Sequence, residues 1–436
     1  MEITMKINRF LTILCVFFLS IATAYGQSEV FFLGHQFGVG SRAMSMGGAF
    51  TAVSDDYTAT YWNPAGLAQI RRMELLGGMS HLIQDNEALV NERGVLDETH
   101  ATNLNAIGFV FPIPTYRGSL VFAIGYNSVR RFDDGFSYED KFYAQTDSAY
   151  TKSFTELEDG GLNNYVLSGA VEISPNMSIG LSMNIWRGKD NYEWVNSYDS
   201  EINKYYFDYN RETWISTNYS AINFKLGALY RLGVLGRLAA TISTPVKLTA
   251  EEDWEWKRTN FDNYDPDFAD YEEVDGDYGS WDYSIKAPYT FTVGAAFTLF
   301  PNLIISGDVE YSDWTQLKYT SEPPDGNLSE TNRYLKKELR ATAEYRVGAE
   351  FTVPLLNLQL RGGFMNKQLP LREVVSRSDR RYFTAGAGIL LDKQVKLDVA
   401  WLKGWWEDEN YLSAEIPLVT EDIEIDKFLA TIAFRF

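Results

Sequence analysis

The chain has 436 residues, with 59 acidic and 39 basic side chains and a formal net charge of -20. This charge excludes a general nucleic-acid binder, because binding to a polyanion requires a basic surface. Aromatic residues make up 15% of the chain and the mean hydropathy is -0.24, which excludes both a disordered chain and a helical membrane protein.

The N-terminus has the pattern of a cleaved export signal. A short basic start precedes an apolar run from Phe10 to Ala24. Small residues allow cleavage after Ala24 or after Gly26, and we favour Gly26, so that residues 1–26 form the signal peptide. The chain has one cysteine, Cys15, which lies in this segment. The mature chain is therefore expected to lack disulfides, a thiol nucleophile and a thiolate metal site.

The next segment differs in composition from the rest of the chain. Residues 37–68 are rich in Gly, Ala, Ser and Met. Asp55 and Asp56 are placed to cap a short helix that must end before Pro64. Such small residues suit a compact piece of chain packed in a confined space.

Alternation of apolar and polar residues dominates the remainder and predicts strands. In residues 341–353, for example, Tyr345, Val347 and Phe351 alternate with Glu344, Arg346 and Glu350. We predict fourteen strands in all, at residues 73–82, 101–111, 118–128, 164–173, 177–187, 220–231, 236–248, 285–299, 302–313, 340–353, 357–366, 381–391, 394–403 and 425–436.

The connections between these strands decide the architecture. Alternation alone also fits a secreted β-sandwich or a propeller. Here short turns, such as residues 174–176 and 300–301, alternate with long polar segments, such as residues 130–163, 188–219 and 249–284. Short turns at one end, long loops at the other and an even strand number indicate an all-β fold, a transmembrane antiparallel β-barrel of about fourteen strands. The localisation expected is the cell outer membrane.

Three features of the barrel segment bear on its surroundings. The last strand alternates up to a terminal aromatic, Phe436, as is typical of strands read by the barrel assembly machinery. Tryptophans near strand ends predict interfacial girdles: Trp186, Trp314, Trp401, Trp405 and Trp406. Residues 249–284 contain 13 acidic residues and nine aromatics. Solvated surface loops are the favoured interpretation of that segment, and calcium binding stays open because the spacing of a calcium loop is missing.

Signals for catalysis are weak. The chain has three histidines, His35, His81 and His100, without metal-ligand spacing, and neither a nucleophile elbow nor a phosphate loop is evident. We therefore predict no enzyme, no metal and no cofactor. Of the functional hypotheses considered, a hydrolase built on the barrel has the weakest support.

The chain resembles the FadL/TodX-type outer-membrane transporters of long-chain fatty acids and other hydrophobic compounds. Asn63, Pro64 and Ala65 match the Asn-Pro-Ala sequence of that family's N-terminal hatch, and further similar stretches begin at Ser243, Asp308 and Arg346. The resemblance implies a hatch at residues 27–72 that plugs a fourteen-stranded barrel at residues 73–436.

The function implied by the resemblance is passive uptake of hydrophobic compounds, most of all long-chain fatty acids, with a lateral exit at a kinked third strand. Gly125 is the candidate kink, and ordinary packing of small residues against the hatch is an equal alternative. Inward-facing Arg340, Arg346 and Arg361 are candidates to bind a carboxylate, although we favour their pairing with neighbouring acids in an ion-pair lattice.

The partners implied are fatty acids or hydrocarbons, outer-membrane lipid and lipopolysaccharide, and the barrel assembly machinery, with no nucleic acid. A related group of barrels that resembles PorV shares the Asn-Pro-Ala type of plug and serves protein secretion or surface attachment. That role is the alternative function, because the motif indicates architecture more firmly than cargo.

Overall fold

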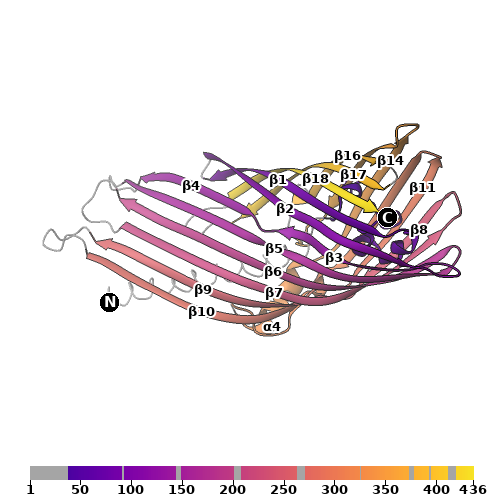
Figure 1. Cartoon of the computed structure of the whole chain (residues 1–436). Coiled ribbons are helices and arrows are strands. Elements are labelled where there is room, and N and C mark those ends of the chain that lie inside the picture. Colours follow the sequence, from indigo (N-terminus) through magenta and orange to yellow (C-terminus); the bar gives the residue numbers. More distant parts are fainter. Residues whose placement is uncertain are drawn as a thin grey trace.

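A computed structural model shows one antiparallel sheet that closes on itself (Figure 1). The strand β1 (Glu74–Val90) pairs with β2 on one side and with the last strand, β18 (Val419–Arg435), on the other. The residues that the structure describes are 38–90, 93–143, 149–200, 208–262, 271–324, 326–372, 378–391, 394–410 and 419–436. The predicted signal peptide and His35 lie outside them.

The remaining strands follow in chain order. They are β2 (Arg93–Ile113), β3 (Leu120–Arg131), β4 (Asp134–Tyr143), β5 (Ala149–Ser174), β6 (Met177–Ser200), β7 (Asp208–Arg231), β8 (Gly236–Ser243), β9 (Lys247–Asp262), β10 (Tyr271–Lys286), β11 (Thr290–Phe300), β12 (Leu303–Asp313), β13 (Lys318–Tyr319), β14 (Ala341–Val353), β15 (Leu358–Lys367), β16 (Arg380–Leu391) and β17 (Val395–Asn410). Three wall strands are interrupted, namely β3 with β4, β8 with β9, and β10 with β11. With these joined and the two-residue β13 set aside, the wall has fourteen strands, which confirms the predicted barrel.

Short helices complete the chain. They are α2 (Ser41–Ser45), α3 (Ala59–Trp62), the 3-10 helices η1 (Pro64–Gln69) and η2 (Trp314–Gln316), and α4 (Leu328–Glu338). In the described part of the chain, no helix combines the length and the apolar character that crossing a membrane requires.

Side chains alternate between the two faces of the wall. On β7, Ile222, Phe224 and Leu226 are exposed on the outside, whereas Asn223 between them is 4% exposed and faces inward. The same pattern occurs on β11, where Val293 is 58% exposed and Thr292 is buried. An apolar outer band of this kind matches the hydrocarbon of a bilayer, and a polar interior is typical of outer-membrane barrels.

Two of the interruptions coincide with prolines. Pro245 lies between β8 and β9, and Pro288 lies between β10 and β11. Proline has no N–H to donate to a neighbouring strand, so it ends or bends a strand inside a sheet.

The segments predicted as long polar loops are largely strands, which corrects that expectation. β4 to β7, β9 and β10 continue far beyond the ends of the shorter strands in the rest of the barrel wall. They form a curved sheet extension (Figure 1). For instance, β5 and β6 keep an unbroken register from Tyr150 and Ser200 to Glu172 and Ser178. Outside the apolar band both faces of a strand carry polar residues, so the alternation that identifies a membrane strand is lost although the backbone pairing continues.

Candidate functional site

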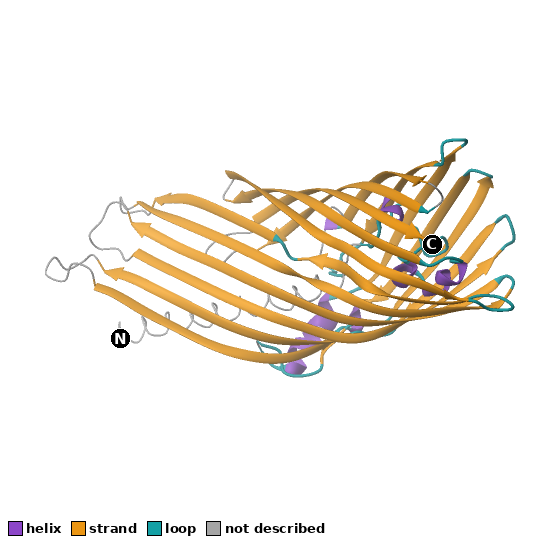
Figure 2. Cartoon of the chain, viewed as in Figure 1, coloured by secondary structure: helices purple, strands orange, loops and turns teal. Residues whose placement is uncertain are grey.

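Residues 38–70, which we call the inner segment, lie within the ring of strands (Figure 2). This segment contains α2, α3 and η1, and almost every residue in it is buried. Its backbone touches the wall at glycines. A Cβ atom added at Gly348 would lie 2.2 Å from the carbonyl oxygen of Met46, and one at Gly363 would lie 2.3 Å from the amide nitrogen of Gly47. Only glycine permits such close approach of two backbones.

The Asn-Pro-Ala sequence holds the inner segment to β6 and β7. Asn63 Oδ1 accepts a hydrogen bond from the Ala65 amide at 3.1 Å and so caps η1. Asn63 Nδ2 donates to the carbonyl oxygens of Thr51 at 2.9 Å and of Ala228 on β7 at 3.3 Å. Ser178 Oγ on β6 donates to the Ala65 carbonyl at 3.0 Å. We call this contact the amide anchor.

A second contact, which we call the ionic anchor, joins α2 to β14, β15 and β17. Arg42 donates from Nε and Nη2 to the two oxygens of Glu350, at 2.8 and 3.0 Å. Arg361 donates to the same carboxylate at 2.7 Å and to Asp398 at 2.7 Å. Arg42 also pairs with Asp55 inside the inner segment. These side chains form one chain of charge-assisted hydrogen bonds, and such bonds stabilise the charged forms of buried side chains.

The charges of the inner segment stabilise each other. Burial alone would raise the pKa of Asp55, but Arg42 and Arg237 outweigh it and hold the pKa of that carboxyl below its ordinary value. Burial would lower the pKa of Arg42, and Asp55 and Glu350 reverse this effect, so that the guanidinium keeps its charge. Both groups are thus ionised at neutral pH.

The three predicted arginines have separate environments. Arg346 pairs with Glu310 and Glu344, each at 3.0 Å, and its guanidinium lies 5.3 Å from the Trp62 ring. Arg361 is fully buried in the ionic anchor. Arg340 lies just before β14, where Nε donates to the Leu369 carbonyl at 3.0 Å. For Arg346 and Arg361 this is the geometry of an ion-pair lattice.

The wall contains a seam beside the inner segment. β2 pairs with β3 only from Ala106 opposite Asn127 to Ile113 opposite Leu120. Beyond that point the ladders of the described residues join β2 to β1 alone, and join the end of β3 and all of β4 to β5 alone. The boundary is bridged by a side chain, because Asn103 Nδ2 donates to Asp133 Oδ2 at 3.3 Å. We call this boundary the β2–β3 seam.

Tyr57 of the inner segment lies where the seam begins. Its ring packs against Gly108 and Gly125, which face each other across β2 and β3. A Cβ atom at Gly125 would lie 2.1 Å from Tyr57 Oη, so a larger residue would displace the ring. Tyr57 Oη donates to Asn127 Oδ1 at 3.2 Å. Gly125 itself sits in continuous register, and the irregularity of β3 lies between Ser128 and Arg130.

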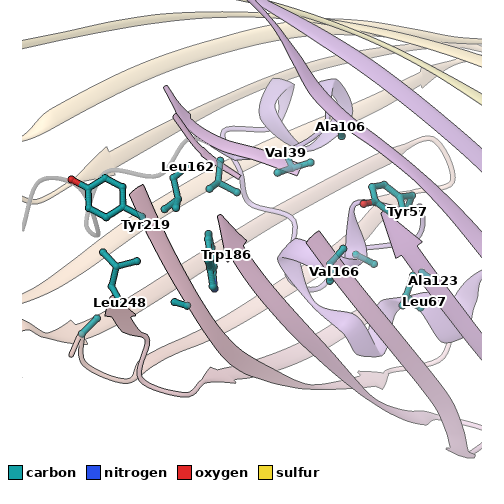
Figure 3. Packing of buried hydrophobic residues seen from close by; sticks show 14 of the residues in the cluster. Val39, Tyr57, Leu67, Ala106, Ala123, Leu162, Val166, Trp186, Tyr219 and Leu248 are labelled. Atoms are coloured by element: carbon teal, nitrogen blue, oxygen red, sulfur yellow. The ribbon is translucent and has the colours of Figure 1, made fainter. Parts of the chain in front are cut away.

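An apolar cluster fills the barrel between the inner segment and the seam (Figure 3). At one end are Tyr57 and Leu67, and at the other Leu162 and Tyr219, with Trp186 and Val39 between them (Figure 3). The cluster reaches the interruption between β3 and β4, because it includes Phe132, whose ring lies 6.5 Å from that of Tyr219. An unbroken path of buried apolar side chains therefore runs from the inner segment to the seam.

Sequence reasoning missed several residues of this region. Trp186, Trp314 and Trp406 were expected at the membrane interface, but all three are buried, at 6%, 7% and 6% exposure. Tryptophan suits either place, so its position near a strand end does not distinguish them. Arg130 was also missed. Its guanidinium lies 5.4 Å from the Phe132 ring, beside the apolar cluster, and Glu158 is among its electrostatic neighbours.

The histidines show no catalytic arrangement in the described residues. His81 and His100 come together on β1 and β2, with ring centroids 6.0 Å apart. His81 Nδ1 is hydrogen-bonded to Thr102 Oγ1 at 2.7 Å, and His100 pairs with Glu98 in an exposed position. No group of three or more His, Cys, Asp or Glu residues able to hold a metal ion occurs in the part of the chain that is described.

Comparison with known proteins gives the family. A family model described as outer membrane protein transport protein (OMPP1/FadL/TodX) matches residues 19–415. No curated protein sequence matches the chain.

Solved structures share the fold at low sequence identity. A Pseudomonas aeruginosa FadL homologue is 11% identical with a TM-score of 0.62, covering 92% of this chain and 100% of that chain. The P. putida toluene transporter TodX is 12% identical with a TM-score of 0.60, covering 92% and 99%. The Ralstonia pickettii toluene transporter TbuX is 14% identical with a TM-score of 0.55, covering 92% and 98%. With the family model spanning almost the whole barrel, the chain belongs to the OMPP1/FadL/TodX family of outer membrane transport proteins, which are not enzymes.

Proposed function

We propose that the protein is a passive outer-membrane channel for hydrophobic compounds, with long-chain fatty acids as its main cargo. In this proposal the inner segment, within residues 27–72, is the plug, residues 73–436 are the channel, and the cargo leaves sideways through the β2–β3 seam. Export through a cleaved signal at residues 1–26 and contacts with the assembly machinery, membrane lipid and lipopolysaccharide belong to the same proposal.

One observation carries the proposal. The apolar cluster reaches from Tyr57 in the inner segment to Phe132 at the interrupted third strand, where the ladder between β2 and β3 has ended. A hydrophobic molecule that follows this cluster meets apolar side chains until it reaches a boundary closed by side chains rather than by a ladder of backbone hydrogen bonds. Opening such a boundary costs less than breaking paired strands, because few backbone bonds are lost.

The choice of fatty acids over neutral hydrocarbons is supported by a cation at the end of the apolar path. The Arg130 guanidinium lies beside Phe132, in the region where the cluster meets the seam. A carboxylate carried into an apolar cavity needs a cation nearby, and an arginine can bind it through two parallel hydrogen bonds. Glu158 and Asp190 are electrostatic neighbours of the Arg130 guanidinium, so a fatty-acid carboxylate would join an existing group of charges there.

Uptake measurements test this proposal. Cells in which this protein is the main route for fatty acids should take up labelled oleate, and Arg130→Met should lower the rate about tenfold while uptake of toluene is retained. Arg340→Met is the matched control, because this arginine is bound to the Leu369 carbonyl and is not part of the apolar cluster. If the protein carries neither oleate nor toluene, the proposed channel is wrong. If Arg130→Met lowers both equally, the arginine does not select the carboxylate.

A further inference from the structure

The outer face of the sheet extension differs from the lipid-facing wall below it. On β6 the exposed outward residues change from Leu181 to Arg187 and Lys189 along the strand. On β9 the outward residues are Glu251, Asp253 and Glu255, and all three are exposed. Charged side chains on the outer face place the extension beyond the hydrocarbon layer, in water.

A cavity of about 830 Å³ lies on this extension, across β4, β5, β6, β7, β9 and β10. One row of its lining residues is a set of direct cross-strand neighbours in which acids alternate with apolar and aromatic side chains. In order across the sheet these are Leu157, Glu193, Trp214, Glu255 and Tyr278. Directly opposite residues of an antiparallel sheet share a face, so each carboxylate of the row is flanked by two apolar or aromatic side chains.

A second row on the same face lies two residues further along the strands. It consists of Asp159, Asn191, Ser216 and Asp253, again direct cross-strand neighbours. Its members are ordered by hydrogen bonds: Ser216 Oγ donates to Asn191 Oδ1 at 3.0 Å, and Asn191 Nδ2 donates to Asp159 Oδ2 at 3.4 Å. The lining thus includes one polar row and one row of acids and rings, and none of its residues is Lys or Arg. The row between these two completes the lining with Asp134, Glu158, Tyr192, Ile215, Trp254 and Gly279.

We propose that this cavity binds a small organic cation, an ammonium group attached to an apolar or aromatic body. Carboxylates on both rows attract the charge, and the Trp214 and Tyr278 rings offer faces for a cation–π contact and for the apolar body. The volume is within the range of sites for small molecules.

The same lining argues against other ligands. The carboxylates do not form a metal-binding group among the described residues. A fatty acid would bring its own negative charge to a lining of acids, so this site is separate from the fatty-acid path inside the barrel. The two proposals can therefore fail independently.

Calorimetric titration of the full-length mature protein in a neutral detergent tests the site. The probe is benzyltrimethylammonium, with benzyl alcohol and phenylacetate as the neutral and anionic comparisons. We expect the cation to bind most tightly and its affinity to fall with added salt. Glu193→Gln combined with Glu255→Gln should weaken binding about tenfold, and Trp214→Leu should also weaken it.

The matched control is Glu251→Gln combined with Asp282→Asn. These two exposed acids face each other on β9 and β10 but do not line the cavity. Their replacement reduces the net negative charge by the same amount as the cavity variant does. Binding in the control should stay close to that of the unmodified protein. Equal binding of phenylacetate, or an equal loss in the control and in the cavity variant, would overturn the proposal. Circular dichroism of each variant verifies that the barrel is folded.

Discussion

The inner segment is held to the wall by two anchors of different chemistry. The amide anchor uses neutral hydrogen bonds from Asn63 and close backbone contact, since a Cβ atom at Gly227 would lie 2.0 Å from Asn63 Oδ1. The ionic anchor uses the buried charges of Arg42, Glu350 and Arg361. The close backbone contact at the amide anchor allows only one position of the inner segment. The ionic anchor is weakened by the loss of a charge, without any change in the shape of the backbone. We therefore expect the inner segment to loosen first on its β14–β17 side while it stays fixed on β6 and β7.

Removing both anchors at once should have the largest effect. Deletion of residues 27–70 is expected to leave a folded, heat-modifiable barrel with an open lumen, because the wall strands pair with each other and not with the inner segment. Conductance in planar bilayers should rise from near zero to that of an open pore. Unchanged conductance would show that the inner segment does not close the channel.

Breaking the ionic anchor alone should have the next largest effect. Glu350→Gln removes the carboxylate shared by Arg42 and Arg361 and should lower the free energy of unfolding by about 3 kcal/mol, because buried cations lose a partner. Denaturant titration in detergent measures this change. The control is Asp275→Asn, which like its partner Arg258 is exposed, and it should cost less than about 1 kcal/mol. Similar losses in the two variants would contradict the assigned role of the buried pair.

Weakening the amide anchor should impair transport more than stability. Replacing Asn63 and Pro64 by alanine removes the cap of η1 and the bond to Ala228 and should cost about 1–2 kcal/mol. Oleate uptake should fall while assembly is unaffected. Gln69→Ala is the control, since Gln69 donates to the Val53 and Ser54 carbonyls, which both lie within the inner segment. An unaltered uptake rate in the double variant would remove the anchor from the mechanism.

The alternation of residues was sufficient to predict the barrel wall, because a strand between lipid and lumen must present an apolar side and a polar side. It failed for the extension, where water reaches both faces and residues such as Glu156 and Leu157 carry no membrane pattern. The seam could not be predicted either, but the reason is different. It is defined by a missing partner strand beyond Asn127, and no residue type marks such an absence.

The site was predicted only in part, because many of its contacts join residues that are far apart in the sequence. The Asn-Pro-Ala sequence is local and was recognised, whereas the packing of Tyr57 against Gly108 and Gly125 joins three distant parts of the chain. Arg346 and Arg361 were correctly placed on the inward face by the alternation of β14 and β15, but their partners depend on the register between strands.

Acid should produce the smallest effect, by weakening the pair between Arg42 and Asp55. The folded-state pKa of Asp55 lies below its ordinary value, so its stabilisation is complete above the ordinary carboxyl pKa of about 4 and is lost as the pH falls through the lower folded value. Conductance should therefore increase slightly below about pH 4. Asp55→Asn should remove this pH dependence; if the variant and the unmodified protein respond alike, another group controls the acid effect.

A reversible cross-link of the β2–β3 seam tests the central claim most directly. Asn103→Cys with Asp133→Cys places two thiols where a side-chain hydrogen bond now bridges the seam, and the mature chain is expected to contain no other cysteine. Phe111→Cys with Phe122→Cys joins the same strands where they are already paired and serves as the control. We predict that oxidation or a short bifunctional reagent blocks oleate uptake only in the first variant, and that cleavage of the link restores it. Full uptake through a cross-linked seam would contradict lateral exit.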